Sequence, residues 1–588
     1  AIAASSLGAA TVAPTCVPDV MNATARLPGT TLVVTPAPGA RDAMPQTQVS
    51  LLGAPVHEIA SLEVRGSVSG LHSGRLESYS QHDGGSFVPD TPFVAGESVT
   101  ITGSVTADGR ATPFAYGFTI GEPDPIDKLP EHGISKGRPG TVLHFASATQ
   151  ITPSALTVTV DSAAARRDGD IFLAAYPGPG RTGPTIFDPS GQLVWFKPLP
   201  LGTFATNVRV QRYAGHPVLT WWQGLVSIHG FGLGEGEIYS TSYQRVATIH
   251  AGDGLQEDLH ELQLAPNGSA LITTWKPLFC DLASVGGPAY SAVYDAAFQE
   301  IDVRTGLVRY EWDSIEHLPL SDSYMPASGA KVSWPYDWFH LNSIALEPDG
   351  HILISARATW ALYEIDPATG QVEWELGGRA PSFTMGPGTA TAWQHDARVL
   401  GPDTFSAFDN GGPPSSLQHS HGIVLRLDPQ THTVSLVDRI AIPTPIFSET
   451  QGDLELLPDG NWWLGWGNVN ESSEVSPSGK LLFEAHTPDG SQSYRSLRFP
   501  WSARPHTHPQ TAILPGSRLA VSWNGATDVA SWQLDAGDTS STMRPVSTTA
   551  RAGFQTTLTI PAGAKYVRVV AISTSGKQLA YSAIARAN

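Results

Sequence analysis

Cysteine is nearly absent from this sequence, which has only Cys16 and Cys280 among its 588 residues. No Cys-x-x-Cys pair exists, so a zinc site built on paired cysteines is excluded. In an oxidising compartment, one disulfide between the two cysteines would tie the N-terminal segment to the body of the protein. Two free, buried thiols are the alternative.

Charged residues are also scarce, at 15%, and Lys and Arg (35) are outnumbered by Asp and Glu (54), which gives a net charge of −19. The shortage of basic residues argues against a nucleic-acid partner, and the acidity is interpreted as a source of solubility. No run of about 18 apolar residues exists, so no membrane-spanning helix is expected. The opening Ala-Ile-Ala-Ala-Ser-Ser is typical of a mature end left by signal-peptide removal, which predicts a secreted protein (extracellular, cell-surface or periplasmic).

Glycine (58) and proline (47) are abundant, which favours many short strands joined by tight turns and predicts an all-β fold. A turn followed by an apolar strand recurs six times, as in Asp349-Gly-His-Ile-Leu-Ile. A second hairpin with a D-P-x-T-G-like turn follows most copies, as in Ile365-Asp-Pro-Ala-Thr-Gly-Gln-Val. Two hairpins per unit make a four-stranded blade, so six units predict a six-bladed β-propeller over residues 140–503.

The flanking sequence divides into further domains. Residues 1–45 are rich in Ala, Thr and Pro and are predicted to form an extended arm. Short alternating runs between Pro/Gly turns predict a small β-sandwich over residues 46–125. The strand pattern changes after the propeller, and residues 504–588 are predicted to form a fibronectin type III/Ig-like β-sandwich.

Three histidines stand at the start of similar segments in the repeat region: His260, His340 and His395. Equivalent positions of propeller blades converge on one axis, so these side chains are expected to meet in the central channel, with Arg357 at the end of a nearby strand. Imidazole can act as nucleophile, acid or base, and arginine can hold an anion in two hydrogen bonds. Histidines with a purely structural place between blades, or three histidines around a metal ion, are the alternatives.

Other motifs carry less information. Gly178-Pro-Gly-Arg-Thr-Gly183 matches a dinucleotide-binding motif, but a strand follows it instead of a helix, so a hairpin loop is the better interpretation. No phosphate-binding GxxxxGK[ST] loop and no GxSxG nucleophile motif is present. The pairs His419/His421 and His506/His508 are interpreted as solvated or structural. Trp338 and Trp393, near the histidine segments, are candidates for lining an aromatic pocket.

The segments around the histidines resemble the arylsulfotransferase (aryl-sulfate sulfotransferase) family. The resemblance is carried by Asp337-Trp-Phe-His340-Leu-Asn-Ser, Ser355-Ala-Arg357, Gln394-His395-Asp-Ala-Arg and Phe408-Asp-Asn-Gly. It implies a six-bladed propeller that transfers a sulfuryl group from an aryl sulfate donor to a phenol acceptor, with no nucleotide donor, cofactor or metal.

The resemblance also assigns roles to residues. His395 would become transiently sulfated in a ping-pong mechanism, and His260, His340 and Arg357 would bind the sulfate and transfer protons. Asn342 matches an accompanying position of the family and is expected to contact substrate, as are Trp338 and Trp393 from their place near the histidine segments. For His395 to attack sulfur, another group must hold its second ring nitrogen, and Asp396 and Asp409 are the candidates. An extracellular or cell-surface binding protein with a catalytically silent propeller is the alternative function, and a metal-dependent hydrolase or quinoprotein-like oxidoreductase is the third.

Overall fold

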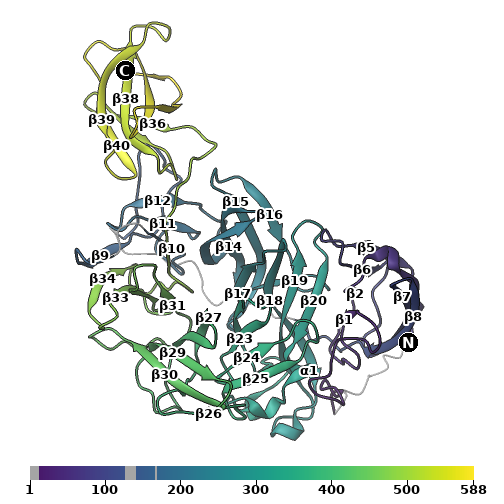
Figure 1. Ribbon diagram of the computed structural model, residues 1–588. Helices are drawn as coiled ribbons and strands as arrows, with labels where there is room; N and C mark the ends of the chain where they lie inside the picture. The colour runs from purple at the N-terminus through teal and green to yellow at the C-terminus, as the bar shows by residue number, and fades with distance from the viewer. Residues whose placement is uncertain (1–11, 126–140, 166–168, 588) are drawn as a thin grey trace, which may run out of the picture.

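The computed structural model describes residues 12–125, 141–165 and 169–587. Nearly every element in these ranges is a β-strand in an antiparallel sheet (Figure 1), so the predicted all-β class is confirmed. The one α-helix of the described residues is α1 (Ser314–His317), and none of their helices is long and apolar enough to cross a membrane. The short 3-10 turns are η1 (Val56–Glu58), η2 (Ala283–Val285), η3 (Leu320–Asp322) and η4 (Ala327–Gly329).

Two four-stranded sheets share one hydrophobic core in the N-terminal part, with strand orders β1-β2-β6-β5 and β4-β3-β7-β8. Alternate residues point into this core, as do Val99, Ile101 and Val105 of β7. β1 pairs with β2 although it lies within the segment predicted as an arm, so the predicted boundary at residue 45 cuts through a sheet. The strands are β1 (Val33–Thr35), β2 (Val49–Leu52), β3 (Ile59–Gly66), β4 (Gly70–Leu71), β5 (Gly74–Ser78), β6 (Gly84–Pro89), β7 (Ser98–Ala107) and β8 (Arg110–Thr119).

Five sheets follow, and the largest, with nine strands, contains two successive sets of four strands, β13–β16 and β17–β20, joined by one β15–β17 pair. We refer to the resulting sets of four antiparallel strands as units 1 to 6. Unit 1 contains β10 (Asp170–Leu173), β11 (Thr185–Phe187), β12 (Leu193–Phe196) and β35 (Leu497–Phe499); unit 2 contains β13 (Phe204–Tyr213), β14 (His216–Val226), β15 (Gly232–Ser240) and β16 (Arg245–Ile249). Unit 3 contains β17 (Glu257–Leu264), β18 (Ser269–Cys280), β19 (Ser291–Asp302) and β20 (Val308–Asp313); unit 4 contains β22 (Leu341–Leu346), β23 (Ile352–Ala356), β24 (Ala361–Ile365) and β25 (Val372–Gly377).

The last two units each gain an extra strand at the outer edge. Unit 5 contains β27 (His395–Gly401), β28 (Thr404–Asp409), β29 (His421–Asp428) and β30 (Thr433–Ile440), and β26 (Thr384–Met385) pairs with β30. Unit 6 contains β31 (Asp453–Leu456), β32 (Trp462–Gly465), β33 (Glu471–Val475) and β34 (Leu481–His486), and β9 (Thr157–Asp161) pairs with β34. A short β21 (Tyr336–Asp337) runs parallel to β19.

The D-P-x-T-G turns explain the outer hairpins of the units. In the turn between β24 and β25, the Asp366 carboxylate accepts hydrogen bonds from the Ala368 amide (2.8 Å) and the Thr369 hydroxyl (2.8 Å). Gly370 follows with a φ of +77°, a conformation that glycine adopts without steric cost. The repeated motif therefore fixes the position at which each chain reversal occurs.

Contacts between the first strands of the units close into a cycle. β13, β17, β22, β27 and β31 contact one another in this order, and β35 contacts both β31 and β13 while pairing with β10. The segment around residues 493–499, predicted to close the ring, thus completes the sheet of unit 1. Side chains at one end of these five first strands converge on one place.

The C-terminal part contains two further sheets, β36-β37-β40 and β39-β38-β41-β42 with β43, around one core that includes Trp532. In Figure 1 these strands extend from the side of unit 1, whereas the N-terminal strands lie beside β19 and β20. The strands are β36 (Gln510–Leu514), β37 (Arg518–Ser522), β38 (Val529–Gly537), β39 (Arg544–Ala550), β40 (Gln555–Thr559), β41 (Tyr566–Ser573), β42 (Gln578–Tyr581) and β43 (Ala585–Arg586).

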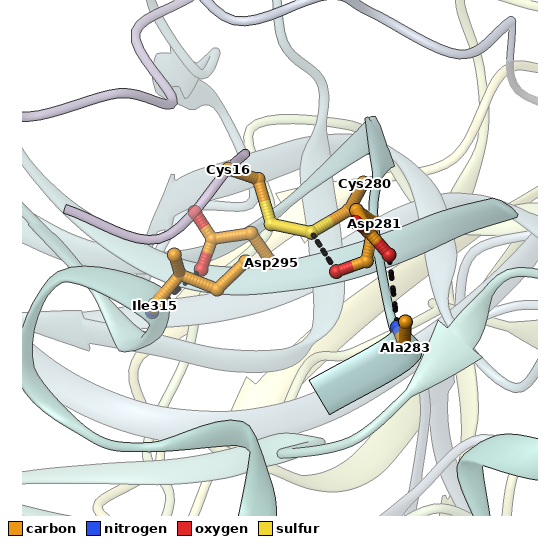
Figure 2. Close-up of a disulfide and its surroundings, with 6 residues drawn as sticks. All are labelled: Cys16, Cys280, Asp281, Ala283, Asp295 and Ile315. Carbon is orange, nitrogen blue, oxygen red and sulfur yellow. Dashed lines mark hydrogen bonds between the residues drawn. A yellow bond between two sulfur atoms is a disulfide. The ribbon is translucent and has the colours of Figure 1, made fainter. Parts of the chain in front are cut away.

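The two cysteines form a disulfide, which is one of the two alternatives that the sequence leaves open. Cys16 and Cys280 have a Cα–Cα distance of 5.3 Å, and both side chains are buried (Figure 2). The bond joins the N-terminal segment to the end of β18 in unit 3.

Candidate active site

The three histidines lie at the same end of three neighbouring first strands. His260 lies on β17, His395 begins β27, and His340 directly precedes β22. Each strand carries a break in register at this end, and the backbone takes left-handed conformations at His340 (φ 59°) and Asp396 (φ 56°). Bulges of this kind re-aim side chains and often lie next to active sites.

A cavity of about 460 Å³ opens where these strand ends meet. Its walls include all three histidines and Arg357, which confirms that sequence positions more than a hundred residues apart converge. The His260 and His340 rings are almost perpendicular, with centroids 4.9 Å apart. Other lining residues are Tyr176, His229, Trp334, Glu449, Gln451 and Tyr494. The volume is in the range of small-molecule sites.

His260 and His340 are both held by carboxylates. The Nδ1 atom of His260 is 2.5 Å from Asp258 Oδ2, and that of His340 is 2.5 Å from Asp337 Oδ2. Asp258 is itself fixed by the Gly232 amide (2.6 Å) and the Thr273 hydroxyl (2.9 Å). Each Nδ1–H therefore donates to a carboxylate, and each Nε2 is left to act in the cavity.

His395 is held differently, by neutral acceptors. Its Nδ1 lies 2.7 Å from Asn410 Oδ1 and 3.0 Å from the Trp393 carbonyl oxygen. Its Nε2 accepts a hydrogen bond from the backbone N–H of Gln451 (3.2 Å). The Asn410 amide is oriented because its Nδ2 donates to the Ser448 and Gln451 carbonyls (3.0 and 2.9 Å). The proton is thus on Nδ1, and the lone pair is on Nε2.

The electrostatics separate the histidines further. Burial lowers the pKa of His395 well below its usual range, and the positive charge of Arg357 lowers it more. Burial also lowers the pKa of His340, although the Asp337 carboxylate opposes this shift. Burial alone would raise the pKa of Asp258, but the attraction of His260 and the hydrogen bonds to its oxygens outweigh burial and lower it. At neutral pH, His395 is therefore a neutral base, and the Asp258 carboxylate beside His260 is ionised.

Arg357 supplies positive charge to the cavity. Its guanidinium lies over the Trp393 ring, 4.8 Å from the ring centroid, and its only described hydrogen bond is a long one from Nη2 to the Glu449 carbonyl (3.4 Å). Its Nε is buried with no hydrogen-bond partner among the described residues. Since arginine stays protonated, this group is available for an anion.

Residues 209–487 match the family model described as Arylsulfotransferase (ASST). This region of the chain belongs to the arylsulfotransferase family. Membership implies sulfotransferase activity at the level of the family, with aryl sulfates and phenols as substrates. All three histidines, Arg357 and Asn410 lie within the matched arylsulfotransferase region, whereas Tyr494 lies outside it.

The other comparisons are weaker. No curated protein matches the sequence. One similar solved structure is a protein of unknown function from Bacteroides caccae, with 14% identity and a TM-score of 0.35; the match covers 56% of this chain and 99% of that one. Another is virginiamycin B lyase from Staphylococcus aureus, with 10% identity and a TM-score of 0.28; the match covers 62% of this chain and 95% of that one. A third is a quinonprotein alcohol dehydrogenase-like protein from Bacteroides thetaiotaomicron, with 12% identity and a TM-score of 0.25; the match covers 80% of this chain and 98% of that one. These similarities are too low to indicate a function.

Three residues predicted to bind substrate lie outside the lining of the arylsulfotransferase cavity. Trp338 is fully buried in the core of units 3 and 4, against Phe339, so its position does not support a role in binding. Asn342 is also fully buried, where its Nδ2 donates to the Gln394 carbonyl (2.7 Å). Trp393 packs against the Arg357 guanidinium, and it contributes to the cavity by positioning that side chain.

The predicted partners of His395 are corrected as well. Asp396 forms ion pairs with Arg398 (2.6 Å) and Arg495 (2.9 Å), and the Asp409 carboxylate accepts the Ala392 amide (2.9 Å). Both carboxylates are thus engaged by other groups, and the described hydrogen-bond partners of the His395 ring are Trp393, Asn410 and Gln451. The role falls to Asn410, whose only signal in the sequence is its place in the Phe408-Asp-Asn-Gly motif.

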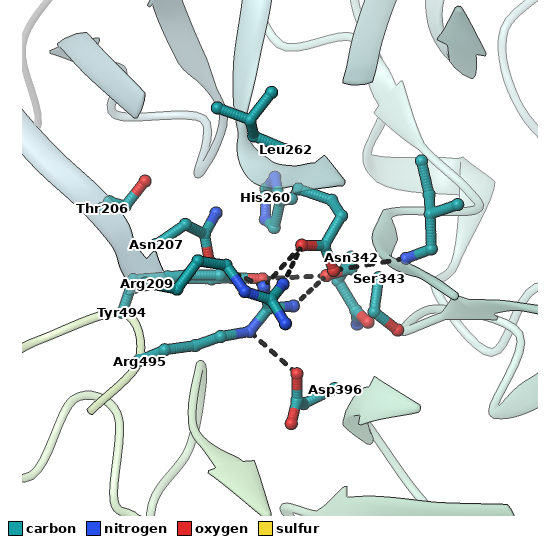
Figure 3. A network of polar contacts seen from close by, with 12 residues as sticks. Thr206, Asn207, Arg209, His260, Leu262, Asn342, Ser343, Asp396, Tyr494 and Arg495 are labelled. Atoms are coloured by element: carbon teal, nitrogen blue, oxygen red, sulfur yellow. Dashed lines mark hydrogen bonds and ion pairs between the residues drawn. The ribbon is translucent and has the colours of Figure 1, made fainter. Parts of the chain in front are cut away.

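The floor of the cavity comes from the segment that closes the ring. The Tyr494 ring lies between His260 and His395, at centroid distances of 5.3 and 6.4 Å, and its hydroxyl donates to the Asn342 carbonyl (3.0 Å). Below it, the buried Arg495 binds one residue from each of four units (Figure 3). Its partners are Asn207 (2.6 Å), Glu261 (3.1 Å), the Asn342 carbonyl (3.1 Å) and Asp396 (2.9 Å).

Clusters of His, Asp and Glu atoms close enough to share a metal ion occur elsewhere in the described residues. One is Glu471, Glu484 and His486, and the other is Asp42, Asp295 and Asp313. The three histidines of the cavity do not form such a group there. Of the other histidine pairs, His421 is buried with its Nδ1 donating to the His419 carbonyl (3.2 Å).

Proposed function

We propose that the chain is a secreted arylsulfotransferase with a six-bladed β-propeller, flanked by an N-terminal β-sandwich and a C-terminal fibronectin type III/Ig-like β-sandwich. The cycle of contacts between the first strands supports the propeller, and each pair of flanking sheets with a shared core supports a sandwich. The Cys16–Cys280 disulfide supports an oxidising compartment.

The reaction is transfer of a sulfuryl group from an aryl sulfate to a phenol through a sulfohistidine at His395. The observation that carries this proposal is the difference between the three Nδ1 partners. An amide oxygen and a carbonyl accept from Nδ1 of His395 and leave the lone pair on Nε2, where the Gln451 backbone N–H donates to it and has to be displaced by the donor sulfur. A carboxylate lies against Nδ1 of His260 and of His340 instead, and it can stabilise positive charge on these rings during proton transfer. The site thus combines one nucleophile with two acid–base groups.

In the first half-reaction, Arg357 binds the sulfonate oxygens of the donor. His395 Nε2 attacks sulfur, the bond between sulfur and the aryl oxygen breaks, and His260 or His340 donates a proton from Nε2 to that oxygen. The product phenol leaves, and the sulfuryl group stays on His395. The positive charge of Arg357 stabilises the charge that develops on the sulfonate oxygens.

In the second half-reaction, an acceptor phenol takes the place of the first. The histidine that donated a proton now removes one from the acceptor hydroxyl, whose oxygen attacks sulfur. The bond between sulfur and Nε2 breaks, and His395 returns to its neutral form. No nucleotide, metal or other cofactor takes part, and the covalent intermediate requires ping-pong kinetics.

The test uses 4-nitrophenyl sulfate with and without phenol. We expect nitrophenolate release that depends on phenol and yields phenyl sulfate. His395→Ala should lower this rate by at least about 10³-fold, because the nucleophile is lost. His351→Ala is the matched control. His351 also contacts an aspartate (Asp349, 3.2 Å), but it lies in the turn between β22 and β23 and does not line the cavity.

Two results would contradict the proposal. Release of free sulfate without any acceptor would identify a hydrolase. Folded protein that binds aryl sulfates but turns over none of a series of phenol acceptors would identify an extracellular binding protein with a silent propeller.

A further inference from the structure

A cluster of buried charges joins the N-terminal sheets to unit 3, outside the active-site cavity. Lys276 of β18 has its Nζ 2.5 Å from Asp313 Oδ1, 3.2 Å from Glu311 Oε1, 3.3 Å from Asp42 Oδ2 and 3.8 Å from Asp295 Oδ2. All five side chains are at most 5% exposed. Asp42 belongs to the N-terminal part, and the others belong to β18, β19 and β20.

One lysine does not neutralise this cluster. Glu316 of α1 adds a fifth buried carboxyl group, which lies against Asp42 and whose pKa is raised by burial and by the charges of Asp42 and Asp313. Uncompensated buried charge is costly, so the cluster needs further positive charge, either as bound protons or as a cation.

The oxygen positions suit a cation. One carboxylate oxygen from each of Asp42, Asp295 and Asp313 lies within 4.8 Å of the other two. In a calcium site each oxygen lies about 2.4 Å from the ion, so two oxygens on opposite sides of the ion are about 4.8 Å apart. One ion can therefore contact all three carboxylates. A set made only of carboxylate oxygens selects a hard cation such as Ca²⁺ over softer metals.

Unpartnered oxygens also point to a ligand. Glu316 Oε1 comes from a different element and is not one of those three oxygens. Like Asp42 Oδ1 and Asp295 Oδ2, it is buried and receives no hydrogen bond from an amide, hydroxyl or cationic group of the described residues; these carboxyl groups lie against one another. The other Asp295 oxygen, Oδ1, accepts the Ser314 hydroxyl (2.9 Å) and the Ile315 amide (3.1 Å), which fixes the carboxylate beside the disulfide (Figure 2). Oδ2 is thereby held toward the cluster.

We propose that a divalent cation, Ca²⁺, binds here between Asp42, Asp295, Asp313 and Glu316. Lys276, whose Nζ lies within 3.8 Å of Asp42, Asp295, Glu311 and Asp313, supplies part of the positive charge, and the ion supplies the rest. The ion ties the N-terminal sheets to unit 3 at a second point, near the Cys16–Cys280 disulfide. The sequence has no motif for this site, since its ligands are dispersed between residues 42 and 316.

The test measures calcium content and thermal unfolding of the full chain, neither of which depends on sulfotransfer. Protein purified with calcium and then dialysed against metal-free buffer should retain one Ca²⁺ per chain by elemental analysis. Removal with a chelator should lower the unfolding temperature by several degrees, and CaCl₂ should restore it more effectively than MgCl₂.

Substitutions locate the ion. Asp295→Asn and Glu316→Gln should each lose the bound calcium and the response of the unfolding temperature, and the second variant serves if the first does not fold. Glu484→Gln is the matched control, because it alters the half-exposed Glu471/Glu484/His486 cluster. The proposal is overturned if calcium is lost only in Glu484→Gln. It is equally overturned if the wild type binds no calcium and its unfolding temperature changes neither with chelator nor with CaCl₂. Protons shared between the carboxyl groups would then be the neutralising charge.

Discussion

At the scale of single residues, the atom that faces each histidine Nδ1 assigns its chemistry. A carboxylate favours the imidazolium form, and an amide oxygen favours the neutral imidazole. The sequence predicts that His260, His340 and His395 meet, since they start equivalent repeats. It does not predict Asn410 as the partner of His395, because the bulge in β27 decides which of Asp396, Asp409 and Asn410 reaches the ring, and local sequence does not encode that geometry.

The pH dependence of the first half-reaction follows from the His395 pKa. In the proposed mechanism its neutral form is the nucleophile, and burial lowers its pKa well below the ordinary value of 6.5. The nucleophile is therefore neutral at every pH above this lowered pKa. We expect the pre-steady-state release of nitrophenolate to keep its rate as the pH falls through 6.5 and to decline only in more acidic solution. A midpoint at or above 6.5 would contradict this assignment.

Asp337 is expected to act through His340 as a positioning residue. In Asp337→Asn, the protonated form of His340 loses its counter-charge, so protonation of the leaving group should slow by about 10²-fold. The loss should be larger with phenyl sulfate than with 4-nitrophenyl sulfate, whose leaving group needs little protonation. Asp349→Asn, which removes a similar partner from His351, should change neither rate. An equal loss with both donors would indicate that Asp337 has only a structural role.

At the scale of elements, the repeated turns predict most of the fold, while the loops at the cavity mouth escape prediction. The D-P-x-T-G pattern places hairpins because its hydrogen bonds are local, as at Asp366. Trp338 and Trp334 show the limit of such prediction. They are four positions apart in the sequence, yet Trp338 is buried in the core and Trp334 is 48% exposed and lines the cavity. Burial at this level depends on neighbouring units and not on local sequence.

Trp334 is expected to bind the aryl group of the substrates. Its ring lies 4.6 Å from that of His229 between centroids, so the two rings offer a stacking surface. Trp334→Ala should raise the KM for phenol acceptors by about 5-fold with little change in kcat, because one aromatic contact contributes about 1 kcal/mol. Tyr581→Ala, a loss of an exposed ring in the C-terminal part, is the control. An unchanged KM would place the aryl group elsewhere.

At the scale of the whole molecule, Arg495 joins units whose sequences are distant. It binds side chains or carbonyls from units 2, 3, 4 and 5 and lies directly beneath the cavity. The sequence predicts that this segment closes the ring, through its strand pattern. It cannot predict the ion network, since the partners span residues 207–396 and come together only in the closed ring.

Arg495→Met is expected to destabilise the protein by about 3–5 kcal/mol, because it leaves Glu261 and Asp396 buried without one of their cations. Arg504→Met is the matched control: Arg504 pairs with Asp528 (2.8 Å), but both side chains are exposed, so the change should stay within about 1 kcal/mol. Urea unfolding of the two variants measures the difference. Equal effects would mean that the Arg495 network does not stabilise the ring.

The sulfohistidine at His395 is the central claim, and one measurement tests it directly. The protein is mixed with 4-nitrophenyl sulfate without acceptor, the burst of nitrophenolate is counted, and the digested protein is analysed by mass spectrometry under mildly alkaline conditions. We expect one nitrophenolate per chain and one SO₃ group on the peptide that contains His395, removed when phenol is added. Absence of a burst, or the group on a different residue, would contradict the account.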